Sequence, residues 1–337
     1  MSMLEQHEVA AYLLKRRLVS RRAIVSGRLR IADASSRNRN YRVSGAPGVS
    51  YLLKQGIVAD SAHSLANEVA LYRRLTAGGG ALAACVPRLH GHDRRRGILI
   101  LEWVAGGEDL LALHRRRARC SPGLAAALGR ALATVHHVTP DGEALREDAP
   151  WVLALHRPPL EALRYLSAGS IELVTRLQAD PRLGAAFDAL REAWRAEALV
   201  HRDVKWANCI AYAPGAGAGA RPTRIKLVDW EMAGWGDPAF DIGSAFSDFA
   251  LFELDGAPAG AVRPAAAAFW RAYVRTRRLD ARAADRLLEL SSRYAGARLV
   301  QTAYEHTQET VTMGPRVERI MRLAGDLLLG ERPGIMP

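Results

Sequence analysis

The sequence predicts an α+β fold of two lobes, in which a small antiparallel sheet with one helix precedes a larger and mainly helical part. Short runs of β-type residues, separated by turns, fill most of the first hundred positions. Ala- and Leu-rich stretches with a helical period dominate the rest. At 337 residues the chain is also longer than one hydrophobic core usually supports. We therefore expect an N-terminal lobe at 1–103 and a C-terminal lobe at 104–337.

Local patterns predict the elements of the N-terminal lobe. A helix is expected at 64–75, where Leu65, Val69, Tyr72 and Leu75 recur at helical spacing. Three consecutive glycines at 78–80 end this pattern. Strands are expected on both sides of the helix, at 23–31, 40–43, 50–54, 86–91 and 97–104.

The C-terminal lobe is predicted to be helical apart from one hairpin. Helices are expected at 123–138, once or twice within 171–200, and two or three times between 264 and 329. The segment PGAGAGARPT at 214–223 consists of small and flexible residues. Such a composition is typical of the tip of a lengthened hairpin and of no binding site.

Composition restricts the class of protein. With 49% hydrophobic and 24% charged residues the chain has the composition of an ordinary globular protein. No run of eighteen apolar residues predicts a membrane span, and the first residues carry acids and bases where a signal peptide needs an apolar core. We expect a cytoplasmic protein without membrane association. Three scattered cysteines show no spacing of a zinc site or disulfide framework.

An excess of positive charge raises the question of nucleic acid. The chain has 47 Lys and Arg against 35 Asp and Glu, a formal charge of +12. Such an excess favours anionic partners through long-range attraction. The arginines are nevertheless dispersed along helical segments, and no zinc finger, aromatic ribonucleoprotein strand or helix-turn-helix motif accompanies them. We expect no specific binding of nucleic acid.

Two acidic motifs carry the strongest functional signal. LVHRDVKWAN at 199–208 fits the pattern H-R-D-x-x-x-x-N, in which the Asp accepts the proton of an attacking hydroxyl and the Asn holds a metal ion. Asp203 and Asn208 occupy these positions. LVDWE at 227–231 then places Asp229 after an apolar strand. A single His-Arg-Asp triplet is often a solvated loop, but the order and spacing of both motifs together predict a phosphoryl-transfer site.

Further residues of such a site are expected in the N-terminal lobe. Lys54 ends the apolar run YLLK, as the lysine that contacts nucleotide phosphates ends a strand in kinases. Glu68, on the following helix, is placed to pair with Lys54; a solvated strand-end lysine is the alternative. No G-x-G-x-x-G loop precedes them. In its place Ser36 and Asn38 offer polar donors to phosphate oxygens, or else form a polar hairpin turn.

The chain resembles the aminoglycoside phosphotransferase and choline kinase-like family, a branch of the protein-kinase fold, over nearly its whole length. The resemblance implies a bilobal kinase-like fold, ATP and Mg²⁺ as cofactors, Asp203 as base, and Asn208 and Asp229 as Mg²⁺ ligands. It also implies that the backbone around Glu102 and Val104 receives adenine. The agreeing segments are S-x-N-x-x-Y-R-V at 36–43, Lys54, Glu68, LEWVAGG at 101–107, HRDVKWAN at 201–208 and VDWEMAGWGDPAFDIGS at 228–244.

Two departures bear on the acceptor. Many members of the family have His-Gly-Asp, whereas Arg202 and Lys205 resemble Ser/Thr protein kinases, in which the lysine steadies the transferred phosphoryl group. The region after Asp241 is also rich in arginine, which disfavours a cationic drug. We expect transfer to a peptide Ser/Thr or an anionic metabolite of bacterial secondary metabolism. The residues of these motifs are similar to those of kinases in class V lanthipeptide biosynthesis, and this resemblance would add a partner lyase. An antibiotic phosphotransferase and a nucleotide-binding pseudokinase scaffold are the alternatives.

Overall fold

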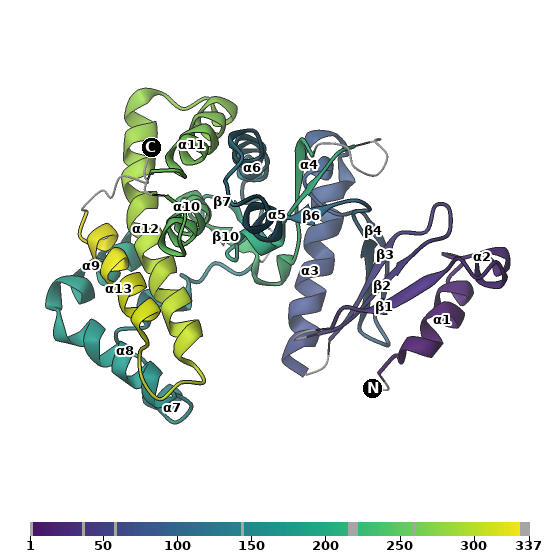
Figure 1. Ribbon diagram of the computed structural model, residues 1–337, viewed down its shortest axis with the longest axis horizontal. Helices are drawn as coiled ribbons and strands as arrows, with labels where there is room; N and C mark the ends of the chain where they lie inside the picture. Colours follow the sequence, from purple (N-terminus) through teal and green to yellow (C-terminus); the bar gives the residue numbers. More distant parts are fainter. Residues whose placement is uncertain are drawn as a thin grey trace. The chain divides into compact units, whose positions relative to one another are not determined.

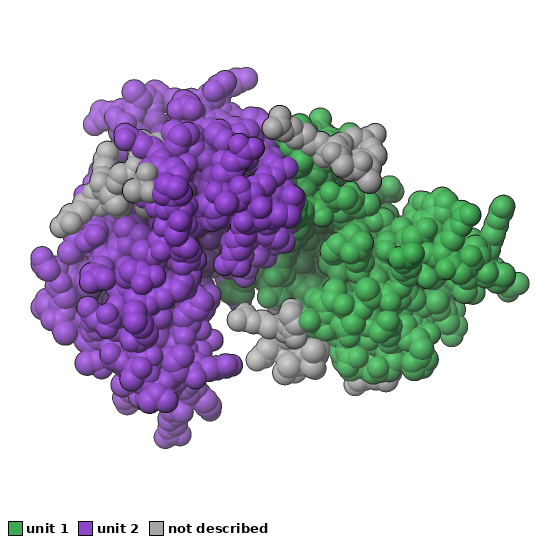
Figure 2. Space-filling view, viewed as in Figure 1, with its two compact units in different colours: residues 1–108, 210–232 green, residues 109–209, 233–337 purple. Residues whose placement is uncertain are grey.

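The structure, a computed structural model, describes residues 3–35, 38–56, 59–142, 145–214, 222–258 and 260–330, without the side chains of 59–64. The chain divides into two compact units (Figures 1 and 2). Unit 1 comprises Met1–Glu108 and Ile210–Met232, and unit 2 comprises Asp109–Cys209 and Ala233–Pro337. The segment with Asp229 thus returns to unit 1, a feature that a single boundary near Trp103 does not include.

Unit 1 is built on a five-stranded antiparallel sheet. Its strands lie in the order β1-β2-β3-β5-β4. Their bounds are Arg30–Asp33 (β1), Arg39–Ser44 (β2), Tyr51–Gln55 (β3), Leu89–Asp93 (β4) and Ile98–Glu102 (β5). The inner strand β5, between β3 and β4, is apolar and Ile98–Leu101 are buried. A strand buried on both of its faces needs cover on both sides of the sheet.

Helices supply that cover. Alternation along β3 directs Leu53 and Lys54 to opposite faces of the sheet. Leu53 joins Val9 and Leu13 of α1 (Val9–Lys15) in one core cluster. Lys54 pairs with Glu68 of α3 (Ala59–Ala77) on the other side. Figure 1 shows α1 and α3 on opposite sides of the sheet. The sheet therefore presents one lysine to the helix that carries its partner.

The structure corrects the sequence prediction at the start of the sheet. A strand was expected at 23–31, but α2 (Arg21–Val25) occupies its first part and β1 begins at Arg30. The hydroxyl of Ser20 accepts a hydrogen bond from the backbone N–H of Ala23 and caps this helix. Helices η1 (Gln6–Glu8), α1 and α4 (Gly80–Ala84) are also additional to the one helix expected in this lobe.

The returning segment is hydrogen-bonded to the rest of unit 1. It contains part of β8 (Cys209–Tyr212), together with β9 (Arg224–Leu227) and η4 (Trp230–Met232). The N–H of Leu227 donates to the carbonyl of Cys85 at 2.7 Å, and the Lys226 ammonium lies 2.9 Å from a Glu102 carboxylate oxygen. Most of the predicted hairpin tip at 214–223 lies outside the described residues.

Unit 2 is mainly helical. The helical predictions at 123–138, 171–200 and 264–329 are confirmed, with three helices in the last region. The elements are β6 (Glu108–Asp109, at the junction), α5 (Leu110–Arg117), α6 (Pro122–Val135), η2 (Trp151–Ala154), α7 (Leu160–Leu163), α8 (Ala168–Ala179), α9 (Pro181–Ala193), β7 (Ala198–Val200), η3 (Trp206–Asn208), β10 (Gly234–Gly236), α10 (Pro238–Leu254), α11 (Arg263–Arg277), α12 (Ala281–Thr307) and α13 (Pro315–Leu328). No helix in the described part of the chain is both long and apolar enough to cross a bilayer.

Small residues allow the helices of unit 2 to pack closely. A Cβ atom on Gly129 of α6 would lie 2.3 Å from the carbonyl oxygen of Phe269 in α11. A Cβ atom on Gly243 of α10 would lie 2.6 Å from the carbonyl oxygen of Ser291 in α12. Since both neighbours are backbone atoms, a side chain at either position would force the two helices apart.

We expect Gly129→Ala to destabilise the protein by about 2 to 3 kcal/mol, because α6 and α11 must separate to admit the methyl group. Gly123→Ala is the matched control in the same helix, since the nearest atom to its Cβ is the Ser121 Oγ at 3.9 Å. The control should be neutral or slightly stabilising. Urea unfolding of both variants measures the difference, and equal stabilities would contradict the packing argument.

Candidate functional site

Unit 1 surrounds one lysine with three carboxylates. Lys54, at the end of β3, is 6% exposed. Its Nζ lies 2.6 Å from Asp229 Oδ1, 3.0 Å from Glu68 Oε2 and 3.1 Å from Glu231 Oε2. These partners come from α3 and from the segment after β9, so the cluster joins three parts of unit 1 that are distant in sequence.

The charges of this cluster are strongly coupled. Burial alone would lower the pKa of Lys54, but the negative charges of Glu68, Asp229 and Glu231 outweigh it and raise this pKa above its ordinary value. Burial raises the pKa of Glu68 to about 7, although Lys54 opposes the change. The ammonium therefore stays protonated at neutral pH, with three carboxyl groups around it.

The backbone at Asp229 holds a conformation that is rare for a residue with a side chain. Its φ is +68°, in the left-handed region, where Asp and Asn are better tolerated than other side chains. The indole N–H of Trp230 donates to the carbonyl of Leu227 at 2.9 Å and closes this turn. Leu227 thus fixes the turn at one end and Lys54 fixes the Asp229 carboxylate.

Unit 2 holds the second cluster, centred on Asp203 between β7 and η3. The Lys205 ammonium lies 2.7 Å from Asp203 Oδ2. The Asn208 side chain donates from Nδ2 to the carbonyl oxygen of Asp203 at 3.0 Å and to its Oδ2 at 3.1 Å. The Arg298 Nη2, from α12, lies 3.5 Å from Asp203 Oδ1. Donors on both sides of the carboxylate fix its plane.

These neighbours also decide the ionisation of Asp203. Burial would raise the pKa of its carboxyl group, but Arg298 and Lys205 outweigh burial and hold this pKa below its ordinary value. Asp203 is therefore ionised at neutral pH and can accept a hydrogen bond from a hydroxyl group. Its carboxylate remains 20% exposed, so a ligand can reach it.

A buried carboxylate beneath this loop holds its backbone in place. Asp241 of α10 is fully buried, and it accepts the N–H of His201 at 2.7 Å and the N–H of Arg202 at 2.9 Å. His136 Nε2 lies 3.2 Å from the same carboxylate, and its Nδ1 lies 2.9 Å from the Tyr273 hydroxyl. Although burial opposes it, these interactions keep the pKa of Asp241 low.

Arg202 is a structural residue in this arrangement. Its φ is +66° and its side chain is 7% exposed. The guanidinium donates to the carbonyls of Trp235 at 2.6 Å and Arg146 at 2.9 Å, and it lies 5.4 Å from the centre of the Trp194 ring. Both of these hydrogen bonds come from Nη2, which is therefore directed at backbone carbonyls within unit 2.

The segment expected to receive adenine offers one free backbone donor. The N–H of Glu102 donates to Arg88 at 2.8 Å, and the Glu102 side chain lies 2.9 Å from Lys226 Nζ. The carbonyl of Val104 accepts the N–H of Gly107 at 2.9 Å. Among the described residues, however, the N–H of Val104 has no hydrogen-bond partner. Val104 thus keeps a donor for a ligand.

The loop expected to cover phosphates is described only in part. Ser36 lies outside the described residues, and the half-buried Asn38 lies in a bend before β2. The hydroxyl of Ser35 accepts the N–H of Asn40 at 3.1 Å, so it braces the turn. The roles assigned to Ser36 and Asn38 stay predictions.

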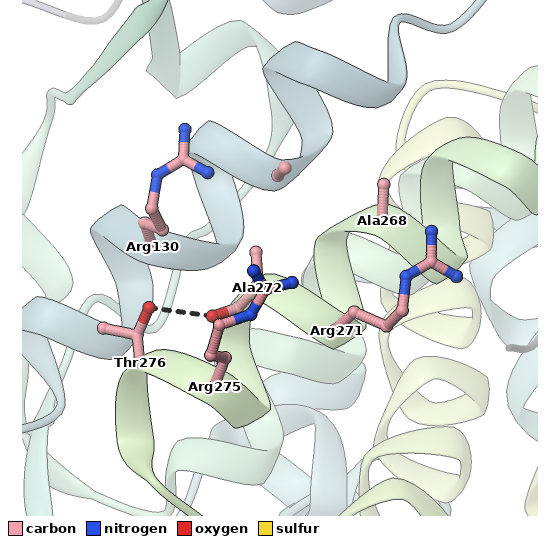
Figure 3. Close-up of a pocket in the computed structure, with 7 residues that line it drawn as sticks. Arg130, Ala268, Arg271, Ala272, Arg275 and Thr276 are labelled. Carbon is pink, nitrogen blue, oxygen red and sulfur yellow. Dashed lines mark hydrogen bonds between the residues drawn. The ribbon is translucent and has the colours of Figure 1, made fainter.

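Sequence reasoning missed the role of Arg298. It appeared only as one of many basic residues after Asp241, and most of these lie on the surface. Arg130, Arg271 and Arg275 line a groove of about 250 Å³ between α6 and α11 (Figure 3), and no described carboxylate forms an ion pair with any of the three. None of the groove residues belongs to the Asp203 cluster. Only the tertiary packing of α12 distinguishes Arg298 from these surface arginines.

Residues 28–290 match the model of the phosphotransferase enzyme family. No protein with a curated description matches the sequence. An ethanolamine kinase from Plasmodium vivax shares 12% identity with a TM-score of 0.58, covering 96% of this chain and 87% of its own.

Two further solved structures show the same fold. A choline/ethanolamine kinase family protein from Mesorhizobium loti shares 18% identity with a TM-score of 0.51, covering 95% of this chain and 99% of its own. A macrolide 2'-phosphotransferase from Brachybacterium faecium shares 18% identity with a TM-score of 0.50, covering 94% and 98%. At these identities the likeness extends to the fold, and it confirms the predicted bilobal kinase-like α+β class.

We expect Asp241→Asn to lower the free energy of unfolding by about 3 kcal/mol, because an amide NH₂ would face one of the two backbone N–H donors and leave it unsatisfied. Asp280→Asn is the control, since this exposed residue caps α12 and Asn caps a helix equally well. Chemical denaturation compares the two. A loss below about 1 kcal/mol for Asp241→Asn would show that the carboxylate does not hold the loop.

Proposed function

From the premise that this chain belongs to the phosphotransferase enzyme family, whose members phosphorylate hydroxyl groups, we propose that it transfers the γ-phosphoryl group of ATP to a hydroxyl of an anionic small molecule. The observation that carries the proposal is the environment of Asp203. This carboxylate is ionised, partly exposed and held by three donors. A positioned carboxylate of this kind is suited to accept the proton of an attacking hydroxyl.

The proposed reaction needs little covalent chemistry from the protein. The acceptor oxygen forms a bond to the γ-phosphorus, the bond from this phosphorus to the β–γ bridging oxygen breaks, and ADP leaves. The hydroxyl proton passes to Asp203. Lys205, whose side chain is 45% exposed, offers a positive charge to the transferred group. Positioning and charge neutralisation supply most of the rate in such reactions.

The residues expected to hold Mg²⁺ have suitable chemistry. Because Asn208 donates from Nδ2 to Asp203, its amide oxygen is left as an acceptor. The Asp229 carboxylate is 37% exposed and lies among carboxylates that outnumber Lys54. Oxygen ligands of this type are those that Mg²⁺ prefers. When bound, the metal would neutralise phosphate charge, and we assign Asn208 and Asp229 as its protein ligands.

The remaining nucleotide contacts are assigned to unit 1. Lys54 is held by Glu68 at 3.0 Å, so its ammonium is positioned before a nucleotide binds and serves the α- and β-phosphates. The unpartnered N–H of Val104 and the carbonyl of Glu102 serve the adenine edge. Ser36 and Asn38 are assigned to the phosphate cover on the sequence pattern alone.

Charge around Asp203 favours an anionic acceptor. Lys205 and Arg298 both lie within 4 Å of this carboxylate, so a cationic acceptor would meet two like charges there. This disfavours an aminoglycoside-modifying enzyme. A peptide Ser/Thr acceptor and a partner lyase stay predictions that rest on the residues of the two sequence motifs. Membership of an enzyme family, with Lys54 and Asp203 present, argues against a pseudokinase scaffold.

Asp203→Asn should retain ATP binding and slow single-turnover transfer by about two to four orders of magnitude, because the proton acceptor is lost while the shape is kept. Asp229→Ala should instead lose Mg²⁺-dependent binding of ATP. Calorimetry with ATP and rapid-quench measurement of ADP separate the two effects. A fully active Asp203→Asn protein would contradict the assignment of Asp203 as the base.

ATP with Mg²⁺ should stabilise the protein by about 2.7 kcal/mol at a hundredfold excess over the dissociation constant. Lys54→Met should reduce this gain, because the phosphates lose their cation. Lys15→Met removes an exposed lysine of α1 and is the matched control. Thermal unfolding with and without nucleotide provides the measurement; equal shifts in both variants would exclude Lys54 from the nucleotide site.

A further inference from the structure

Arg298 is a buried cation with unused hydrogen-bond donors beside the proposed base. It lies on α12 and is 5% exposed. One guanidinium nitrogen, Nη2, lies 3.5 Å from Asp203 Oδ1. The other two nitrogens, Nε and Nη1, are buried and have no partner among the described residues. Since buried donors without acceptors are costly, a buried guanidinium of this kind indicates a missing oxygen ligand.

The local charge has the sign that an anion requires. Asp203 is shared by two cations, Lys205 and Arg298. The charge of Arg298 also acts on the carboxyl group of Asp248. Burial raises the pKa of Asp248 to about 7, although a hydrogen bond from the Trp206 backbone and the charge of Arg298 oppose this. Near neutral pH, cationic charge around Arg298 is therefore not fully compensated by the carboxylates.

A cavity of about 630 Å³ lies within unit 2 near the loop that carries Asp203; Arg298 itself is not among the residues that line it. Trp206, three positions after Asp203, lines it together with Asp248, which accepts the Trp206 backbone N–H. Thr302 and His306 of α12 also line it, one and two turns after Arg298. Leu111, Leu251 and Phe252 add apolar surface. A volume of this size is typical of a small-molecule site.

Among the charged residues that line the cavity, Arg316, Asp255 and His306 are paired with one another, whereas the exposed Arg115 forms no ion pair within the described part of the chain. Arg316 lies 2.8 Å and 2.9 Å from the two carboxylate oxygens of Asp255, in a bidentate pair. The remaining terminal nitrogen of Arg316, Nη1, lies 2.7 Å from His306 Nε2. Arg316 and Asp255 therefore have little capacity left for a ligand, whereas Arg298 keeps two buried donors.

We propose that the acceptor is a hydroxyl compound that carries a carboxylate or phosphate group bound by Arg298, with its apolar part in the cavity lined by Trp206, Phe252 and Thr302. This inference rests on the proposed function and names the acceptor class of the same site. The free N–H groups at Nε and Nη1 lie on different edges of the planar guanidinium, and each can donate to an oxygen of such an anion. Lys205 already offers a charge to the transferred phosphoryl group, so Arg298 is assigned to the acceptor.

Equilibrium binding tests the proposal without turnover. Calorimetry with Mg²⁺ and a non-hydrolysable ATP analogue should compare 3-phenyllactate with its methyl ester, and glycerol 3-phosphate with glycerol. Wild type should bind at least one anion ten- to a hundredfold more tightly than its neutral counterpart. The two pairs distinguish a carboxylate from a phosphate ligand.

Variants assign the preference to a residue. Arg298→Gln should abolish the preference, and Arg298→Lys should restore part of it. Arg271→Gln is the matched control, because it removes the same charge from the exposed groove of α11 (Figure 3) and should keep the wild-type preference. Thr302→Trp should weaken 3-phenyllactate more than glycerol 3-phosphate, because the indole fills the cavity. Thermal unfolding identifies variants that have lost their fold.

Two results would overturn the inference. One is equal binding of anions and neutral counterparts by wild type; the other is an anion preference that survives Arg298→Gln. A different result would contradict the proposed function. Its failure would appear as wild-type ADP release that no hydroxyl compound stimulates and that Asp203→Asn does not change, whatever the binding data show.

Discussion

The arrangement of unit 2 depends on one buried carboxylate, Asp241. A fully buried anion is stable only when donors surround it, and this one receives the N–H groups of His201 and Arg202 and lies against His136. These interactions tie α6 and α10 to the loop that carries Asp203. They also explain how Arg202 keeps a positive φ, because the surrounding bonds offset the strain of that backbone.

The two clusters differ in the sign of their charge. In unit 1, Glu68, Asp229 and Glu231 outnumber Lys54, which suits a bound cation. In unit 2, Lys205 and Arg298 share one ionised carboxylate, which suits a bound anion. A phosphotransferase has use for both, since it handles a metal–nucleotide complex and an acceptor. The net charge of +12 by itself distinguishes neither site, because it also counts residues such as Arg271 and Arg275, which line a groove that shares no residue with the Asp203 cluster.

Local patterns were sufficient for much of the fold. Helix α6 and the apolar strand β5 follow directly from periodicity, and the bilobal class follows from their order. The prediction of a strand at 23–31 was wrong over its first part. There the side chain of Ser20 caps helix α2 (Arg21–Val25), and this cap outweighs the β-type residues of the segment. The sequence named Lys54, Glu68, Asp203 and Asp229 because motifs fix their spacing. It did not identify Arg298, since only the packing of α12 brings that side chain to Asp203, 95 residues away.

Helix α12 carries two sets of residues, one buried in the core of unit 2 and one near the Asp203 loop and the cavity. Ala295, Leu299 and Ala303 are fully buried, whereas Arg298, Thr302 and His306 recur every four residues around the loop and the cavity. Substitutions on the second set can change the shape and charge offered to a ligand while the first set keeps the helix in place. Divergence among paralogues, or directed evolution toward new acceptors, therefore has a route on this helix that leaves the buried packing face intact.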